Sequence, residues 1–241
     1  MKLKYDNVET YLKVIVFFLI VGFGAYFTFP YQIGTDDRIA YLQSFGMTLS
    51  LTISGIVIGL VVGFILAFIR LLKNRVLNFI IDEYIDIIRG TPIILQLMIF
   101  AYIILAAFRD NYYAAIIALG LNSSAYIAEI VRSGISAIDR GQLEAARAMG
   151  LGFSASMFKI VFPQVIKNII PALSNEIISL FKETSIVGYI SIMDLTMKSN
   201  SLQSVIYNPT PLIFAGVIYY ACVKIFSVLV KLLERRLNRN D

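Results

Sequence analysis

The chain has 241 residues, of which 58% are hydrophobic and only 15% are charged, so its composition is that of a membrane protein and not of a soluble domain. Its net charge of +5 is explained by the attraction of Lys and Arg to the inner leaflet, and it gives no reason to expect a nucleic acid partner. The absence of histidine removes the usual catalytic triads and imidazole metal sites, and the lone Cys222 removes disulfide and CxxC chemistry.

Apolar stretches of bilayer-spanning length predict an all-α, polytopic membrane protein with about six transmembrane helices. In chain order the stretches cover residues 12–30, 44–72, 92–108, 112–131, 169–190 and 211–232. The first stretch follows Lys2 and Lys4, but it is too long for a signal peptide and lacks a small-residue cleavage site, so we expect it to be retained. In the second stretch, Gly55, Gly59 and Gly63 predict close packing of a neighbouring helix, within the chain or across a dimer.

The distribution of Lys and Arg predicts the orientation of the chain in the membrane. If the N-terminus lies inside, the outer loops carry few basic residues, namely Arg38, Arg109 and Lys198. Most of the other basic residues then fall in inner segments, as the positive-inside rule requires. We therefore expect a multi-pass protein of the bacterial cytoplasmic (inner) membrane with both termini in the cytoplasm.

A charged segment, DRGQLEAARAMGLGFSASMFKIVFPQ, lies between the fourth and fifth apolar stretches. Asp139 with Gln142 predicts a capping box, and Gly150 stands where a left-handed residue ends a helix. Ser154 is expected to cap a second helix, and Pro163 is expected to limit it. Two firmly terminated helices predict a rigid body on the cytoplasmic side, although a solvated loop is the simpler alternative.

Small, charged and apolar residues have a distinctive spacing in this segment, which runs through Glu144, Ala145, Ala146, Gly150, Ile160, Phe162 and Pro163. The spacing resembles the EAA loop of binding-protein-dependent ABC transporter permeases, with Phe162 where that pattern has Leu. Three further stretches are similar to segments of the polar amino acid uptake branch of these permeases: RGTPIILQL, AYIAEIVRSGI and SLFKETSIVG.

The resemblance covers most of the chain and suggests how it is divided. Residues 1–42 are expected to form an extra N-terminal transmembrane helix and outer loop. Residues 43–235 are expected to form the ABC permease domain, with a cytoplasmic coupling loop at 136–165. Residues 236–241 are expected to form a cytoplasmic tail.

The resemblance implies a type I ABC importer permease fold and the uptake of a polar amino acid by alternating access. It also implies a coupling helix that docks on an ATPase subunit through Glu144, Ala145, Ala146 and Gly150. The implied partners are an ABC ATPase dimer, a second permease copy or paralogue, an extracytoplasmic amino acid binding protein and membrane lipid. Because the chain has no G-x-x-x-x-G-K-[ST] stretch, we expect no enzyme activity and no cofactor in it, and ATP and Mg to bind the partner ATPase.

Polar side chains at membrane depth are costly and therefore indicate a transport pathway. In the fifth apolar stretch Asn175, Glu176, Ser179, Lys182 and Glu183 form one helical stripe. With residues of the third and fourth stretches, these side chains are expected to line one cavity at the bundle centre. The candidates for the substrate pathway are Arg89, Gln96, Glu129, Lys182, Glu183 and Thr184.

Two of these candidates have structural alternatives that the sequence leaves open. Glu129 and Arg132 have the spacing of an i,i+3 ion pair, and Arg89 also suits a gate or a topology anchor. The sequence likewise leaves open which amino acid is carried and whether the permease is a homodimer or a heterodimer.

A gated channel or a secondary transporter without an ATPase partner is the alternative function, since the same charged residues would line an ion route. A membrane enzyme is disfavoured by the lack of histidine and of a nucleophile motif. The charged segment discriminates among these functions, because neither alternative needs a docking site for an ATPase.

Overall fold

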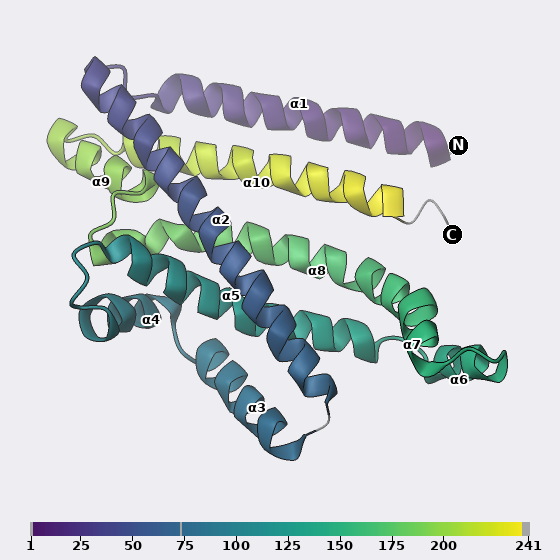
Figure 1. The fold of residues 1–241 in the computed structure, drawn as a ribbon. Coiled ribbons are helices and arrows are strands. Elements are labelled where there is room, and N and C mark those ends of the chain that lie inside the picture. The colour runs from purple at the N-terminus through teal and green to yellow at the C-terminus, as the bar shows by residue number, and fades with distance from the viewer. Residues whose placement is uncertain (1, 73, 238–241) are drawn as a thin grey trace.

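The computed structural model describes residues 2–72 and 74–237, and none of these residues forms a β-strand. The helices are α1 (Lys2–Thr28), α2 (Thr35–Leu71), α3 (Arg75–Gly90), α4 (Ile93–Ile99), η1 (Phe100–Ile104), α5 (Asn111–Ser136), α6 (Arg140–Ala148), α7 (Phe153–Ser156), η2 (Met157–Val161), α8 (Phe162–Glu183), η3 (Thr184–Ile190), α9 (Leu195–Ile206) and α10 (Thr210–Leu237) (Figure 1). The expectation of an all-α protein is confirmed for this part of the chain. The expected tail at residues 236–241 lies largely outside the described residues.

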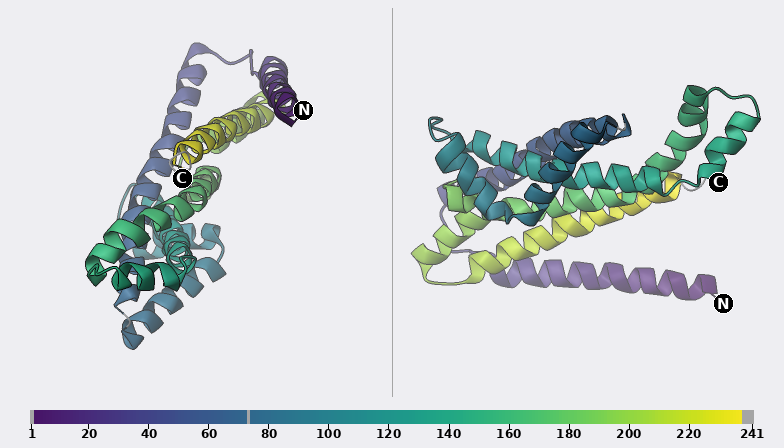
Figure 2. Two further views of the ribbon diagram at one scale, coloured as in Figure 1. Left: turned by 90° about the vertical axis from the view of Figure 1, so that its right-hand side faces the viewer. Right: turned by 90° about the horizontal axis from the view of Figure 1, so that it is seen from below.

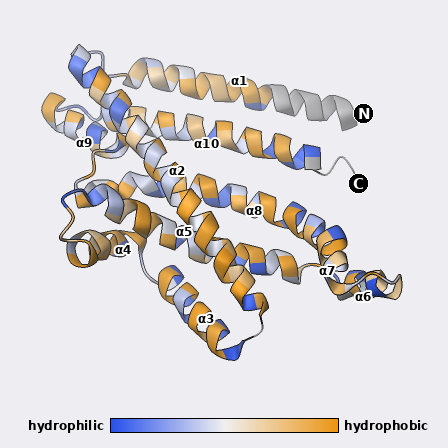
Figure 3. Ribbon diagram, in the orientation of Figure 1, coloured by the Kyte–Doolittle hydropathy of each residue, from blue (hydrophilic) through white to orange (hydrophobic). Residues whose placement is uncertain are grey.

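Among the described residues, three helices are long and apolar enough to cross a membrane, namely Thr35–Leu71, Asn111–Ser136 and Thr210–Arg236. A fourth span is formed if α3 and the α4–η1 segment, which meet at a bend of 105°, count as one. Each of the expected apolar stretches coincides with a helix. Length and composition support three or four spans in the described part, so the expected count of about six is not exactly confirmed. Figure 3 shows apolar residues along α1, α2 and α10, whereas polar residues recur along α8.

Helices α2 and α5 pack closely because glycines recur along one face of α2. A Cβ built on Gly59 would lie 2.8 Å from Ser123 Cβ, and one built on Gly63 would lie 2.7 Å from Ile127 Cγ2, closer than real Cβ contacts. Both partner residues belong to α5 and are buried. The small-residue stripe therefore serves packing within the chain, which answers one question that the sequence left open.

Several segments from distant parts of the chain meet at one end of the bundle. The first turn of α1, the last turn of α10 and the α6–α7 segment lie at this end, hereafter the α6 end (Figures 1 and 2). The loop before α2 and helix α9 lie at the opposite end. Helix α1 lies beside α10 on the outside of the bundle, away from α3, α4 and α5.

One boundary and one helix differ from those expected from the apolar stretches. Helix α2 begins at Thr35, so residue 42, where the extra N-terminal segment was expected to end, lies inside it. Helix α3 was not expected, because it is amphipathic: it buries Ile81 and Ile85 and exposes charged residues on the other side. Asn74 caps its N-terminus by accepting hydrogen bonds from two backbone N–H groups.

Candidate functional site

Helix α6 is terminated at both ends, as the sequence predicts. The Asp139 side chain accepts a hydrogen bond of 2.7 Å from the Gly141 N–H at the N-terminus. At the C-terminus Gly150 has a φ of +88°, and the Leu151 N–H donates to the Ala146 carbonyl at 3.2 Å. This is the geometry of a glycine-terminated helix, in which the left-handed residue satisfies the last carbonyl groups.

The second helix of the charged segment differs from the expectation. Its N-cap is Gly152, not Ser154, and no side chain caps it. Nor does Pro163 stop it, because α7 continues through the π-turn η2 into α8, where Pro163 occupies the first turn. A proline is tolerated there, since the first turn of a helix and a π-turn both relax the demand for its missing N–H. Helix α6 is therefore attached to an unbroken helical arm and not to a separate short helix.

The expected docking residues do not all face outward. Glu144, Ala145 and Gly150 are exposed, whereas Ala146 is fully buried between α6 and the rest of the chain. A Cβ on Gly150 would meet no atom within 4 Å, so the surface around it is open. The exposed face of α6 thus consists of Glu144, Ala145 and their neighbours, and Ala146 holds α6 against its own chain.

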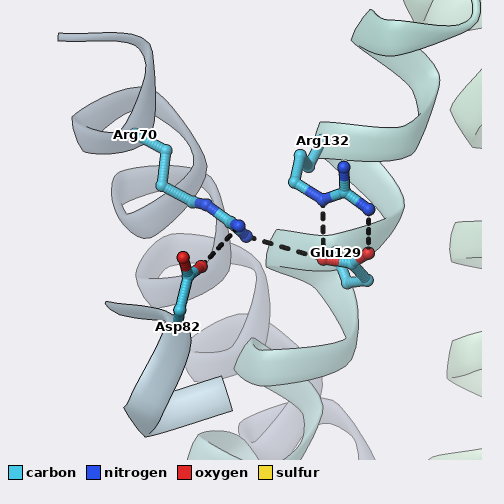
Figure 4. A network of polar contacts seen from close by, with 4 residues as sticks. All are labelled: Arg70, Asp82, Glu129 and Arg132. Carbon is cyan, nitrogen blue, oxygen red and sulfur yellow. Dashed lines mark hydrogen bonds and ion pairs between the residues drawn. The ribbon is translucent and has the colours of Figure 1, made fainter. Parts of the chain in front are cut away.

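An ion network joins three helices near the α6 end (Figure 4). The Arg132 Nε donates to Glu129 Oε2 at 2.9 Å, and a second Arg132 nitrogen binds Glu129 Oε1. Arg70 of α2 lies 3.5 Å from the same Glu129 Oε2 and 2.5 Å from Asp82 Oδ1 of α3. The i,i+3 pair expected as one of two roles for Glu129 is therefore present, and it is part of a larger network.

The remaining candidate of this region, Arg89, lies beside that network. The guanidinium of Arg89 lies over the Tyr126 ring, 5.2 Å from its centroid. Arg89, Tyr126 and Glu129 line a cavity of about 330 Å³, whose far wall is formed by Asn168 and Ala172 of α8. An arginine and a glutamate on one cavity give it charges of both signs.

Gln96 has a structural role within the chain. It is buried, and its Nε2 donates to the Ile88 carbonyl at 2.7 Å and to Thr91 Oγ1 at 2.9 Å. Its Oε1 accepts from Asn122 Nδ2 at 3.3 Å. The amide therefore supports the sharp bend between α3 and α4, where backbone hydrogen bonding is interrupted at Pro92.

The polar stripe of α8 divides between the interior and the surface. Glu176 is buried and accepts a hydrogen bond of 2.8 Å from Ser123 Oγ on α5. Lys182 is exposed, and Glu183 is half-buried with its Oε2 unpartnered among the described residues. Both line a cavity of about 270 Å³ with Ser179 and two isoleucines. Thr184 is buried and donates to the Phe181 carbonyl, so it does not line this cavity.

The expectation of a single central cavity is not met within the chain. The cavity at Glu129 reaches α8 at Ala172, whereas the other cavity contains Lys182, which lies about 15 Å further along the helix at 1.5 Å per residue. Four of the candidates thus form two pairs at different depths, Arg89 and Glu129 near the α6 end and Lys182 and Glu183 toward the opposite end.

A buried polar cluster at the opposite end was missed by sequence reasoning. Asp194 caps α9 by accepting from the backbone N–H groups of Thr196 and Met197, and Thr48 of α2 accepts from the Leu195 N–H at 3.1 Å. Burial raises the pKa of Asp194 above its ordinary value. The available signal was Asp194 itself, because Asp is a common N-cap residue and Asp194 stands three residues before Met197 at the start of a helix.

The geometry is that of an integral membrane protein: its described residues form an all-helical bundle with polar residues along α8 and a charged, terminated helix at one end. Comparison with known proteins identifies its family. The model of the family described as "Binding-protein-dependent transport system inner membrane component" matches residues 55–239, and the chain belongs to this family.

Individual relatives and a solved structure agree with this assignment. The chain is 46% identical over 167 residues to the arginine transport system permease protein ArtQ of Bacillus subtilis (strain 168), covering 68% of this chain and 76% of that protein. It is 34% identical to the L-cystine transport system permease protein TcyB of the same organism, covering 92% and 88%. It superposes with a TM-score of 0.77 on a crystal structure of an amino acid ABC transporter with histidines, at 38% identity, covering 83% and 94%.

Proposed function

We propose that this chain is the transmembrane permease subunit of an ATP-driven ABC importer for a polar amino acid. It takes the substrate from an extracytoplasmic binding protein and releases it to the cytoplasm by alternating access. The family, which depends on binding proteins, and the similarity to permeases named for arginine and cystine support this function.

One structural observation carries the coupling part of the proposal. Helix α6 is exposed and firmly terminated, and the turn at residues 149–152 joins it to α7, which continues through η2 into α8 without a break. The buried Ala146 holds α6 against the rest of the chain. An ATPase that moves α6 therefore moves α8, the helix that bears Glu176, Lys182 and Glu183. A rigid connection transmits such a displacement, whereas a flexible loop would absorb it.

The substrate class follows from the charges that remain available on α8. An amino acid carries an ammonium and a carboxylate, and both lose water when they enter a membrane-embedded site. Lys182 and Glu183 line one cavity and offer one charge of each sign, which compensates for that loss. Arg89 and Glu129 offer the same combination nearer the α6 end, so the two cavities suit successive positions of one substrate.

The exposed polar side of α8 indicates a second permease subunit. Asn175 and Lys182 are both exposed in the single chain, although they lie in the middle and last part of the helix. Polar side chains at membrane depth face a bundle interior or a water-filled path and not lipid. A second copy or a paralogue, facing this side, encloses the path. We propose further, from the distribution of Lys and Arg, that the α6 end and both termini lie in the cytoplasm.

Reconstitution of the complete transporter tests this function. The chain, its ATPase subunit and its binding protein are placed in vesicles, and uptake of labelled polar amino acids is measured together with ATP hydrolysis. We expect uptake that requires ATP, the ATPase and the binding protein. Uptake by the chain alone, driven by an ion gradient, would instead support a secondary transporter or a channel.

The charged pair on α8 is tested in the same vesicles. Lys182→Met and Glu183→Gln each remove one charge from the cavity and should lower uptake while basal ATP hydrolysis persists. Thr210→Val, a substitution at the start of α10, which does not line this cavity, is the control. Unchanged uptake in both α8 variants would exclude the substrate role, and loss of assembly in both would assign the residues to structure.

A further inference from the structure

A groove runs between α1 and the second half of α10 on the outside of the bundle. It has a volume of about 560 Å³. The two helices touch where α1 has glycine, since a Cβ built on Gly24 would lie 2.7 Å from Val217 Cγ2. From this contact they diverge toward the α6 end (Figure 2, right), so the groove is narrow at one end and open at the other.

The walls of the groove are apolar. Val14 and Phe18 on α1 and Val228 and Leu229 on α10 line it, and each leaves about half or more of its side chain uncovered. Within a membrane this apolar part of the groove is filled by hydrocarbon, because Val14, Phe18, Val228 and Leu229 offer water no hydrogen bond. The groove between α1 and α10 therefore has the shape and the apolar lining to hold an acyl chain.

The groove also carries a row of cations, and no carboxylate is among the described side chains that line it. Lys13, Lys224, Lys231 and Arg235 line it. In the part of the chain that the structure describes, no hydrogen bond or ion pair engages Lys224, Lys231 or Arg235. Lys224 and Arg235 are separated by about 16 Å along the helix, so the cations extend from the apolar part of the groove to its open end.

We propose that this groove binds an anionic phospholipid of the membrane leaflet at the α6 end. Its phosphate lies against Lys231 and Arg235 at the open end, and one acyl chain follows Val14 and Phe18 toward the contact at Gly24. Lys224 extends its ammonium group along the apolar wall toward the same phosphate. Basic pockets between transmembrane helices on the cytoplasmic side bind lipid headgroups in this way.

Other occupants fit the groove less well. A free phosphate ion would satisfy the cations but leave the apolar walls unfilled. A second copy of this chain placed across the groove would bring the same cations and so add repulsion. The lipid supplies both the negative charge and the hydrocarbon, and it links α1 to α10 where the protein contacts between them end.

Lipid retention by the full chain tests the proposal. The protein is reconstituted in vesicles of equal parts phosphatidylglycerol and phosphatidylcholine, extracted in mild detergent and examined by native mass spectrometry. We expect retention of phosphatidylglycerol over phosphatidylcholine. Each cation removed should weaken retention roughly fivefold. The variant Lys231→Gln/Arg235→Gln should therefore retain about 25-fold less phosphatidylglycerol.

Matched variants separate the groove from general charge and bulk effects. Val14→Trp fills the groove without changing charge and should also expel the lipid, whereas Ile15→Trp, an exposed neighbour outside the groove, should not. Arg75→Gln removes an exposed arginine elsewhere and should leave retention unchanged. Equal retention of the two lipids, or equal losses in Val14→Trp and Ile15→Trp, would overturn the proposal.

A cross-linking control addresses the second copy directly. In a Cys222→Ser background, Phe18→Cys places a single thiol on the wall of the groove. We expect no disulfide-linked dimer in vesicles when the lipid occupies the groove. A dimer formed through this thiol would assign the groove to a second copy and would contradict lipid binding.

Discussion

The interface between α2 and α5 is tightly packed within the chain, whereas helix α6 has an exposed surface. At the interface, Gly59 and Gly63 let two backbones approach so closely that a methyl group would not fit. On α6, by contrast, Glu144 and Ala145 are exposed. The first surface is packed within the chain, whereas the second is exposed, and we propose that it docks on the ATPase subunit.

The largest expected effect concerns the interface. Gly63→Ala should destabilise the fold by about 1–3 kcal/mol, because its methyl group would lie within 3 Å of Ile127 and of the Ser124 carbonyl. Gly46→Ala, on the same helix but with no atom within 4 Å, should be stabilising by up to about 1 kcal/mol through helix propensity. Thermal unfolding in detergent measures both, and similar shifts in melting temperature would refute the packing account.

An intermediate effect is expected on the exposed surface. Ala145→Trp enlarges the outward face of α6 and should weaken association with the ATPase about tenfold, or ~1.4 kcal/mol. Membrane insertion and melting temperature should not change, because position 145 is exposed. Ala107→Trp, the same substitution at an exposed site near the opposite end, is the control. Association that survives Ala145→Trp would remove this face from the docking surface.

Replacement of Ala146 gives a different result. Because Ala146 is fully buried, a large side chain there should lower the melting temperature before it affects any partner. The comparison of positions 145 and 146 therefore separates docking from internal packing. The sequence pattern places both residues in the same motif and does not distinguish them.

The smallest effect is expected for the ion network between the two regions. Glu129 and Arg132 are partly exposed, so a double-mutant cycle with Glu129→Gln and Arg132→Gln should give a coupling of about 0.5–1 kcal/mol in stability. If Glu129 contacts the substrate instead, Glu129→Gln should reduce uptake and Arg132→Gln should not. Measuring melting temperature and uptake for all members of the cycle distinguishes the two roles.

Long apolar helices and helix caps were predictable from the sequence. Helices α2, α5 and α10 follow from continuous apolar stretches, and the ends of α6 follow from Asp139 and Gly150, which act on their own neighbours. The continuation of α7 into α8 was not predictable, because whether Pro163 stops a helix depends on the π-turn before it. Helix α3 escaped a search for apolar length, since only one of its faces is buried.

The polar residues of the candidate site could be picked out from the sequence, but their grouping in space could not. Polar residues on α8 were found from their helical spacing, yet their division into an inner Glu176 and an outer Lys182 depends on which side faces α5. Gln96 looked like a pathway residue because it is polar at membrane depth. Its donors and acceptor are used at the bend between α3 and α4, which only the three-dimensional structure brings within reach.

Photo-crosslinking from α6 tests the central claim most directly. Glu144 is replaced by p-benzoylphenylalanine in the assembled transporter, and Tyr207, which is 95% exposed near the opposite end, is replaced in the same way as the control. We expect position 144 to cross-link to the ATPase subunit and position 207 not to do so. Cross-linking of the ATPase from position 207 and not from position 144 would contradict both the docking role of α6 and the proposed orientation.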